Sequence, residues 1–128
     1  MFETGTSATV RSFHVMPDMP PPEGERHSHD YRFDIVVTRD ELDERGMVVD
    51  LDVLDDALTD LTTRLDDADL DAIVAPDMGV GAVTVEVFAQ WVHAQLAKPI
   101  GSIGGGATLS VRVYENATAF GGYRAPLA

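Results

Sequence analysis

The sequence contains no cysteine, and this absence excludes several kinds of chemistry at once. Disulfides, thiolate nucleophiles, iron–sulfur clusters and cysteine-based zinc sites are all ruled out. Any metal ion bound by this chain must therefore be held by histidine, aspartate or glutamate side chains.

Basic residues are scarce as well. Nine Lys and Arg residues face 22 Asp and Glu residues, which gives a formal net charge of −13. Nucleic acids and anionic membrane surfaces are recognised through clustered cations, so neither is expected as a partner. Lys98 is the single lysine, and many acids with so little lysine favour a halophilic protein kept dissolved in concentrated salt. The alternative is an ordinary acidic protein from a dilute environment.

Long apolar runs are missing too. No stretch approaches the ~18–20 apolar residues of a membrane-spanning helix, and the first ten residues lack the pattern of a secretory signal. We therefore expect a cytoplasmic protein. An apolar content of 45% with 24% charged residues is typical of a folded chain, and 128 residues suit one domain, residues 1–128.

Alternating apolar and polar residues predict four strands in two pairs. The first pair is separated by a proline-rich segment, which can form neither a helix nor a central strand. Long connections of this kind are usually functional. The last pair reads as a closing hairpin, and residues 47–50 read as a short extended piece. The predicted strands are Thr9–Val15, Tyr31–Thr38, Thr108–Tyr114 and Ala117–Tyr123.

Two helices are predicted between the strand pairs. Leucines at three- and four-residue spacings form one apolar stripe of the first helix. Thr84 is expected to cap the second helix, which runs to about Leu96. Residues 72–81 and 99–106 contain proline and glycine and are expected to be loops. The order β-β-α-α-β-β implies an α+β fold, with a four-stranded antiparallel sheet and both helices on one face. The stripe is Leu51, Leu54, Leu58, Leu61 and Leu65, and the inward residues of the second helix are Phe88, Val92 and Leu96.

Three of the four histidines are predicted to converge. His27 and His29 are two residues apart at the start of a strand, so their side chains point to the same side. His14 lies on the neighbouring strand. Three imidazoles are a typical donor set for catalytic zinc and leave one coordination position open for substrate or water. The alternative is that these histidines are structural. His93 is expected to be a partly exposed residue of the second helix and no ligand.

Several motifs occur together in an order that resembles a known enzyme family. As a set, they resemble the 6-pyruvoyltetrahydropterin synthase and 6-carboxytetrahydropterin synthase family over nearly the whole chain. The T-fold of that family, a four-stranded antiparallel sheet with two helices on one face, agrees with the order of elements above. The motifs are SFH at Ser12–His14, HSHDYRF at His27–Phe33, GMVVDLDVL at Gly46–Leu54, DDADLD at Asp66–Asp71, VTVEVFAQWV at Val83–Val92 and VRVYEN at Val111–Asn116.

The resemblance implies roles for individual residues. Glu115 matches the glutamate that anchors the pterin ring, and a carboxylate can accept two parallel hydrogen bonds from the 2-amino and N3–H edge. Thr84 and Glu86 match a T-x-E motif that implies substrate contacts, although Glu86 also suits the first turn of a helix. The family's zinc ligands are matched by His14, His27 and His29. Subunits of this fold resemble those that close into rings with sites at subunit interfaces, so a homo-oligomer is expected.

The sequence departs from the family at two positions that matter for catalysis. Glu23 stands where the family has its catalytic cysteine. A related branch carries Glu there and cleaves dihydroneopterin to 6-hydroxymethyl-dihydropterin, which implies a carboxylate base beside a Lewis-acidic zinc. Glu25 is the alternative base, because the register is open by two residues. The family's Asp-His dyad reads Asp66–Asp67 here, so the usual Cys-His-Asp relay cannot operate.

The predicted function is a zinc-dependent lyase that processes pterins. Its substrate would be dihydroneopterin or the triphosphate of that compound, cleaved by a retro-aldol step with Glu23, Asp66 and Asp67 as candidate catalytic residues. One alternative is a 6-carboxytetrahydropterin synthase of deazapurine biosynthesis. Another is a catalytically degenerate family member that binds zinc and a pterin, and a third is a metal-free T-fold.

Overall fold

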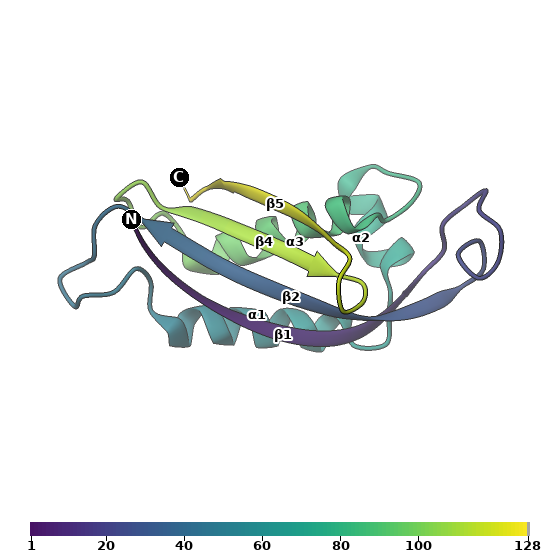
Figure 1. Cartoon of the computed structure of the whole chain (residues 1–128), viewed down its shortest axis with the longest axis horizontal. Coiled ribbons are helices and arrows are strands. Elements are labelled where there is room, and N and C mark those ends of the chain that lie inside the picture. The colour runs from purple at the N-terminus through teal and green to yellow at the C-terminus, as the bar shows by residue number, and fades with distance from the viewer. Residues whose placement is uncertain (128) are drawn as a thin grey trace.

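Two long antiparallel strands dominate the sheet in the computed structural model, which describes residues 1–127 (Figure 1). β1 (Phe2–His14) and β2 (His27–Arg39) pair along their whole length, ending with His14 opposite His27. Both strands begin or end well beyond the predicted limits. In the added part of β1, Thr4 and Thr6 give no apolar alternation, and their partners Val37 and Ile35 on β2 supply the buried side chains.

The sheet has five strands in the order β3-β1-β2-β4-β5, so the prediction of four strands was wrong in number. β4 (Thr108–Tyr114) and β5 (Phe120–Pro126) form the predicted closing hairpin, with β5 starting three residues later than expected. β3 (Ala68–Asp69) adds two residues parallel to the end of β1, which makes the sheet mixed. Residues 47–50 form bends and no strand.

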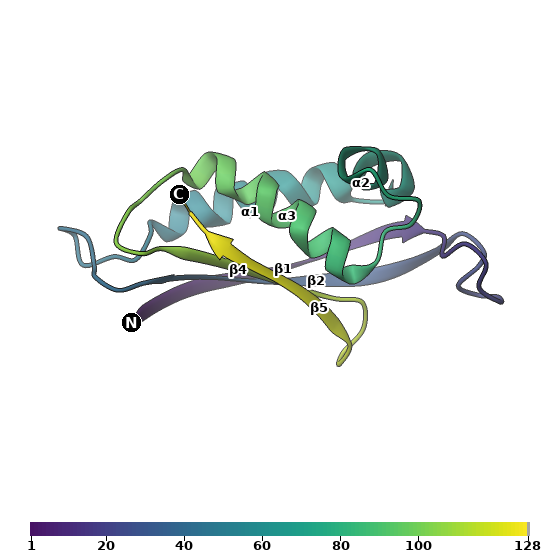
Figure 2. The same cartoon turned by 90° about the horizontal axis from the view of Figure 1, so that it is seen from above.

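Three helices lie on one face of this sheet (Figure 2). α1 (Leu51–Leu65) and α3 (Val85–Ile100) are the two predicted helices. The side chain of Thr84 accepts a hydrogen bond from the backbone N–H of Val87, as predicted for a helix cap. α2 (Leu70–Met78) occupies most of the segment predicted to be a loop, so that prediction was wrong.

The core fills the space between the sheet and the helices. The predicted inward residues of α3 are buried, and so is the stripe of α1 except for Leu51, which is 43% exposed. His93 was predicted to be partly exposed, and this was wrong. It is 8% exposed, faces β5, and has its Nε2 3.2 Å from the carbonyl oxygen of Ala125. The buried stripe residues are Leu54, Leu58, Leu61 and Leu65, and those of α3 are Phe88, Val92 and Leu96.

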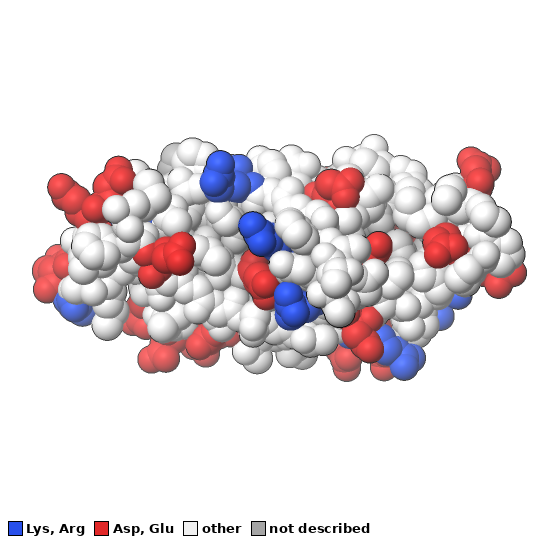
Figure 3. Space-filling view, in the orientation of Figure 1, with Lys and Arg blue, Asp and Glu red and all other residues white. Residues whose placement is uncertain are grey.

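The other face of the sheet is open to solvent and is the face seen in Figure 3. Acidic side chains are scattered over this view, and the basic side chains among them form no broad basic surface. Such a distribution offers no clustered cations on this face, and the exclusion of nucleic acids stays a prediction. Among the described residues, no helix is both long and apolar enough to cross a membrane.

Candidate metal and pterin site

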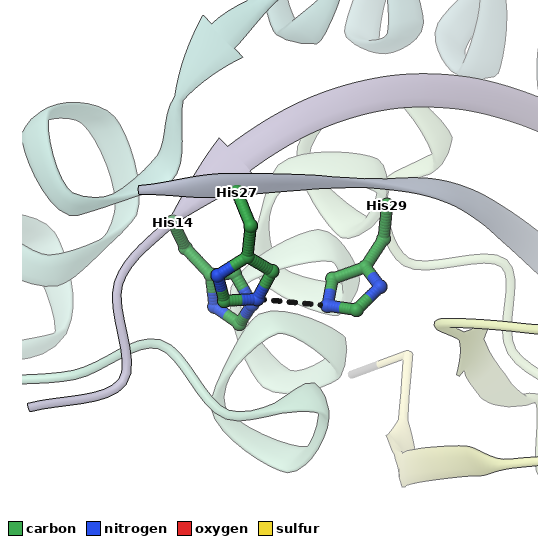
Figure 4. A group of neighbouring side chains, drawn as sticks. All are labelled: His14, His27 and His29. Atoms are coloured by element: carbon green, nitrogen blue, oxygen red, sulfur yellow. Dashed lines mark hydrogen bonds between the residues drawn. The ribbon is translucent and has the colours of Figure 1, made fainter. Parts of the chain in front are cut away.

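The three predicted ligands come together where β1 ends and β2 begins. His14 lies opposite His27 across the strand pair, and His29 is two residues further along β2. All three side chains therefore project from the same side of the sheet (Figure 4). One ring nitrogen from each residue can be chosen so that the three atoms lie within 4.8 Å of one another, and the Nε2 atoms of His27 and His29 are 3.1 Å apart.

Two of the imidazoles are oriented by backbone carbonyls. His14 Nδ1 is 3.0 Å from the carbonyl oxygen of Val83, and His27 Nδ1 is 2.8 Å from that of Glu25. A carbonyl oxygen can only accept, so each Nδ1 must carry the proton. The Nε2 atom of each ring then keeps its lone pair, and in His27 this lone pair is within hydrogen-bond distance of Nε2 of His29. Protonation at Nδ1 is the arrangement seen for histidines that ligate metals through Nε2.

His14 has an unsatisfied ring nitrogen at which a metal ion could bind. Its Nε2 atom is buried and has no hydrogen-bond partner in the described structure, which is costly for a polar atom unless a ligand completes it. Burial also lowers the pKa of His14, so the ring is neutral near pH 7. A neutral imidazole is the form that binds zinc and related divalent ions. The donor set and its protonation state therefore fit such an ion.

Below the histidines, Tyr31 supports the site from the core. Its ring centroid lies 5.3 Å from that of His29 and 6.2 Å from that of His14, and it packs edge-on against Phe88 of α3. Burial raises the pKa of the Tyr31 phenol, and the nearby carboxylates of Glu115 and Asp71 add to this effect. The phenol therefore stays neutral and the aromatic stack fixes the floor under two candidate ligands.

The histidines open into a pocket of about 280 Å³ that gathers most of the predicted site residues. This volume is just below the lower end of typical small-molecule sites, ~300 Å³. The lining residues are His14, Met16, Glu23, His27, His29, Thr84, Val85, Glu86 and Glu115. Seven of these nine were singled out in the sequence, and they come from four separate segments of the chain.

Two acids enter the pocket from opposite ends of the sequence. Glu23, in the loop between β1 and β2, lines the pocket, whereas Glu25 contributes only its backbone carbonyl to His27. Of the two candidate bases, Glu23 is thus the one whose residue lines the pocket. Glu115 follows the last residue of β4, and its Oε2 atom lies 4.0 Å from Nε2 of His29. Glu115 is therefore adjacent to the candidate metal site without belonging to its histidine set.

The start of α3 brings Thr84 and Glu86 to the same pocket. Close packing on β5 fixes this end of the helix. A Cβ atom added to Gly121 would lie 2.7 Å from Cγ2 of Val85 and 2.9 Å from the backbone nitrogen of Glu86, closer than real Cβ atoms approach. A residue without a side chain is therefore needed at position 121 for the first turn of α3 to stand where it does.

The Asp66–Asp67 pair lies outside this pocket within the same chain. Asp66 ends α1 and lines a separate shallow depression with Thr9 and Thr62. Asp67 has a positive φ of 52° and pairs with Arg11, with 3.1 Å between Oδ1 and Nε. The structure therefore does not bring these two acids to the histidines of their own chain.

Three groups at the site were not predicted from the sequence: two backbone carbonyls, which leave no signal there, and the side chain of Asp71, which was overlooked. The carbonyls of Val83 and Glu25 orient ligands, but a backbone group leaves no trace in the residue type. Asp71 was noticed only as part of a motif. Its Oδ2 atom accepts a hydrogen bond from Val15 next to His14, and its buried Oδ1 has no partner in the described structure.

The fold has clear relatives among solved structures. The chain is similar to the 6-pyruvoyl tetrahydropterin synthase of Caenorhabditis elegans, with 17% identity, a TM-score of 0.71, and coverage of 97% of this chain and 95% of that one. It is also similar to that of Plasmodium falciparum, with 12% identity, a TM-score of 0.74 and 98% coverage of both chains. A third similar structure is the 6-pyruvoyltetrahydropterin synthase of Plasmodium vivax, described as a catalytic residue mutant in which a glutamate is replaced. It has 11% identity and a TM-score of 0.75, and the match covers 98% of both chains.

These structures define the class of protein to which the fold belongs, an α+β protein built like the tetrahydropterin synthases. The model of the 6-pyruvoyl tetrahydropterin synthase family matches residues 6–126. The chain therefore belongs to the 6-pyruvoyl tetrahydropterin synthase family, as its motifs predicted. Membership implies a lyase that processes pterins. No curated protein matches the sequence significantly.

Proposed function

We propose that this protein is a zinc-dependent lyase that cleaves the side chain of dihydroneopterin or of its triphosphate. The observation that carries the proposal is one pocket lined by the three histidines, Glu23 and Glu115. Glu115 would accept hydrogen bonds from the 2-amino and N3–H groups of the pterin ring. This contact would hold the ring at one wall and direct its side chain toward the histidines.

The cleavage itself assigns the proton transfers to Glu23. The Glu23 carboxylate would remove the proton of the hydroxyl on the second side-chain carbon, while the bond between the first and second carbons breaks. The electron pair moves to the pterin side, and the proton returns to the first carbon. The products are 6-hydroxymethyl-dihydropterin and an aldehyde. A zinc ion held by His14, His27 and His29 would act as a Lewis acid on the side-chain oxygens.

A glutamate has support as the catalytic group from within the family. The Plasmodium vivax relative has a glutamate that its description calls a catalytic residue. Glu23 is the acid of this chain that lines the pocket from the β1–β2 loop. The absence of cysteine from the sequence leaves no thiol to take the same place.

Asp66 and Asp67 enter this proposal only through an assembly. Both lie outside the pocket of their own chain, so they would act at the site of a neighbouring copy. The sheet has edges at which copies could pair. β5 is an outer strand, and β1 is paired with β3 only at Ser12 and Phe13. A homo-oligomer with sites at subunit interfaces, and a cytoplasmic location, stay predictions.

Incubation with dihydroneopterin and with its triphosphate, followed by chromatography, tests the proposal. We expect 6-hydroxymethyl-dihydropterin from the zinc-loaded protein and none from Glu23→Gln. Glu25→Gln is the matched control and should keep activity, because only its backbone touches the site. A 6-carboxy product, formed when an aldehyde is also supplied, would instead favour the 6-carboxytetrahydropterin synthase alternative. Binding of zinc and pterin without any product would identify a degenerate family member.

A further inference from the structure

The loop between β1 and β2 folds back tightly on itself beside the pocket. Three backbone hydrogen bonds close it: Met16 N–H to Glu23 carbonyl at 2.8 Å, Gly24 N–H to Pro20 at 3.2 Å, and Glu25 N–H to Pro22 at 3.1 Å. Bonds of this kind, clustered within ten residues, make the loop a compact unit rather than a flexible connection.

The loop places two functional groups at once. On one side of Gly24, the Glu23 side chain lines the pocket. On the other side, the Glu25 carbonyl oxygen lies 2.8 Å from Nδ1 of His27 and fixes which nitrogen of that ring carries the proton. Displacement of the loop at Gly24 would therefore move the candidate base and release the candidate ligand together.

Gly24 is the residue on which this packing depends. A Cβ atom at position 24 would overlap the carbonyl oxygen of Met19, a backbone atom that cannot rotate away. The backbone of Gly24 has no positive φ, so close approach and not left-handed conformation is what requires glycine here.

From these contacts we infer that Gly24 is a positioning residue that sets the tautomer of His27 through the Glu25 carbonyl, and with it the affinity of the histidine site for a metal ion. This inference rests on the proposed function only for the identity of the site. Outer-shell contacts to a ligating histidine typically change metal affinity by ~10–100-fold when they are lost. Gly24→Ala should fall in that range.

The test measures Co²⁺ binding, because cobalt reports its own coordination in visible absorption. Gly24→Ala is compared with Gly81→Ala, where an added Cβ meets nothing within 4 Å. We expect Gly24→Ala to bind Co²⁺ ~10–100-fold more weakly and Gly81→Ala to bind like the unmodified protein.

A second measurement needs no variant. Nitrogen-15 NMR of the metal-free protein distinguishes the two histidine tautomers, and His27 should carry its proton on Nδ1. A proton on Nε2 would overturn the inference even if Gly24→Ala fails to fold. Equal Co²⁺ affinity of Gly24→Ala and the unmodified protein would overturn it while leaving the proposed function intact. If the Co²⁺ affinities and the His27 tautomer are as expected but no pterin is cleaved, the proposed function alone is rejected. If the unmodified protein binds no Co²⁺, the inference and the proposed function are both rejected.

Discussion

Replacement of Glu115 by alanine gives the sharpest test of pterin recognition in this pocket. Two hydrogen bonds to a charged acceptor contribute about 1.5–3 kcal/mol each. The Glu115 side chain is 35% exposed, so the lower end of that range applies, because water competes for the carboxylate. Two bonds at that end sum to about 3 kcal/mol, and water that enters the site of the missing side chain recovers part of this. We therefore expect a loss of at least ~2 kcal/mol in binding free energy, about a 30-fold increase in Kd.

Calorimetry with a pterin and with the corresponding lumazine measures this effect against a matched ligand. Lumazine has an oxygen in place of the 2-amino group, so it cannot offer the same pair of donors. The unmodified protein should prefer the pterin, and Glu115→Ala should lose both affinity and preference. The turn that carries Glu115 is held by its backbone N–H to the Ala119 carbonyl, and this bond survives the substitution.

Two results would refute the reasoning. An unchanged pterin affinity in Glu115→Ala would remove Glu115 from the binding site. A weaker affinity with an unchanged preference for the pterin over lumazine would show that the carboxylate acts by general electrostatics, without contact to the ring edge. Metal content should remain the same in both proteins, because Glu115 lies beside the histidine set and not within it.

Four further outcomes are expected. His27→Ala and His29→Ala should each abolish stoichiometric zinc binding in metal analysis. The control variant His93→Ala should keep its zinc. It should lower the free energy of unfolding by about 1–3 kcal/mol, because His93 is buried and has a hydrogen bond to β5. In the metal-free protein, the pKa of His14 is lower in the folded state than in the unfolded chain, so the unfolded chain takes up a proton at higher pH. Denaturation curves should therefore show that the free energy of unfolding falls as the pH drops below 6.5, the ordinary pKa of histidine. Gly121→Ala should destabilise by ~1–3 kcal/mol in the same assay, since the first turn of α3 must shift, and a neutral effect would contradict the close packing. With a net charge of −13, the melting temperature should rise between ~0.1 M and ~1 M salt as repulsion is screened; equal values would reject the halophilic interpretation.

The parts of the fold that the sequence predicted are those with local periodic signals. The leucine stripe of α1 and the Thr84 cap of α3 needed no knowledge of the tertiary structure. The H-x-H spacing predicted a shared side for His27 and His29, because side-chain direction in a strand has a period of two. The full antiparallel register, with His14 opposite His27, is consistent with that prediction but could not be counted from the residues alone.

The parts that the sequence did not predict depend on contacts distant in the chain. α2 was interpreted as a loop because Pro76 and Gly79 usually interrupt helices. In the structure, Asp69 caps this short helix, Pro76 falls in its last turn, and Gly79 ends it in a left-handed conformation. β3 has two residues, too few for any periodic pattern, and its pairing with β1 is non-local. His93 was misjudged because burial on α3 is decided by β5, which lies more than twenty residues away.

The antiparallel register of β1 and β2 has a consequence for folding as well as for chemistry. An ion shared by His14 and His27 would join the two ends of the twelve-residue connection, much as a crosslink does. Binding to the folded state alone would add to stability by mass action, so metal and unfolding equilibria should be linked. A slip of one residue between the strands would turn one imidazole to the opposite surface of the sheet. Metal uptake would thus select the correctly aligned hairpin from misaligned ones.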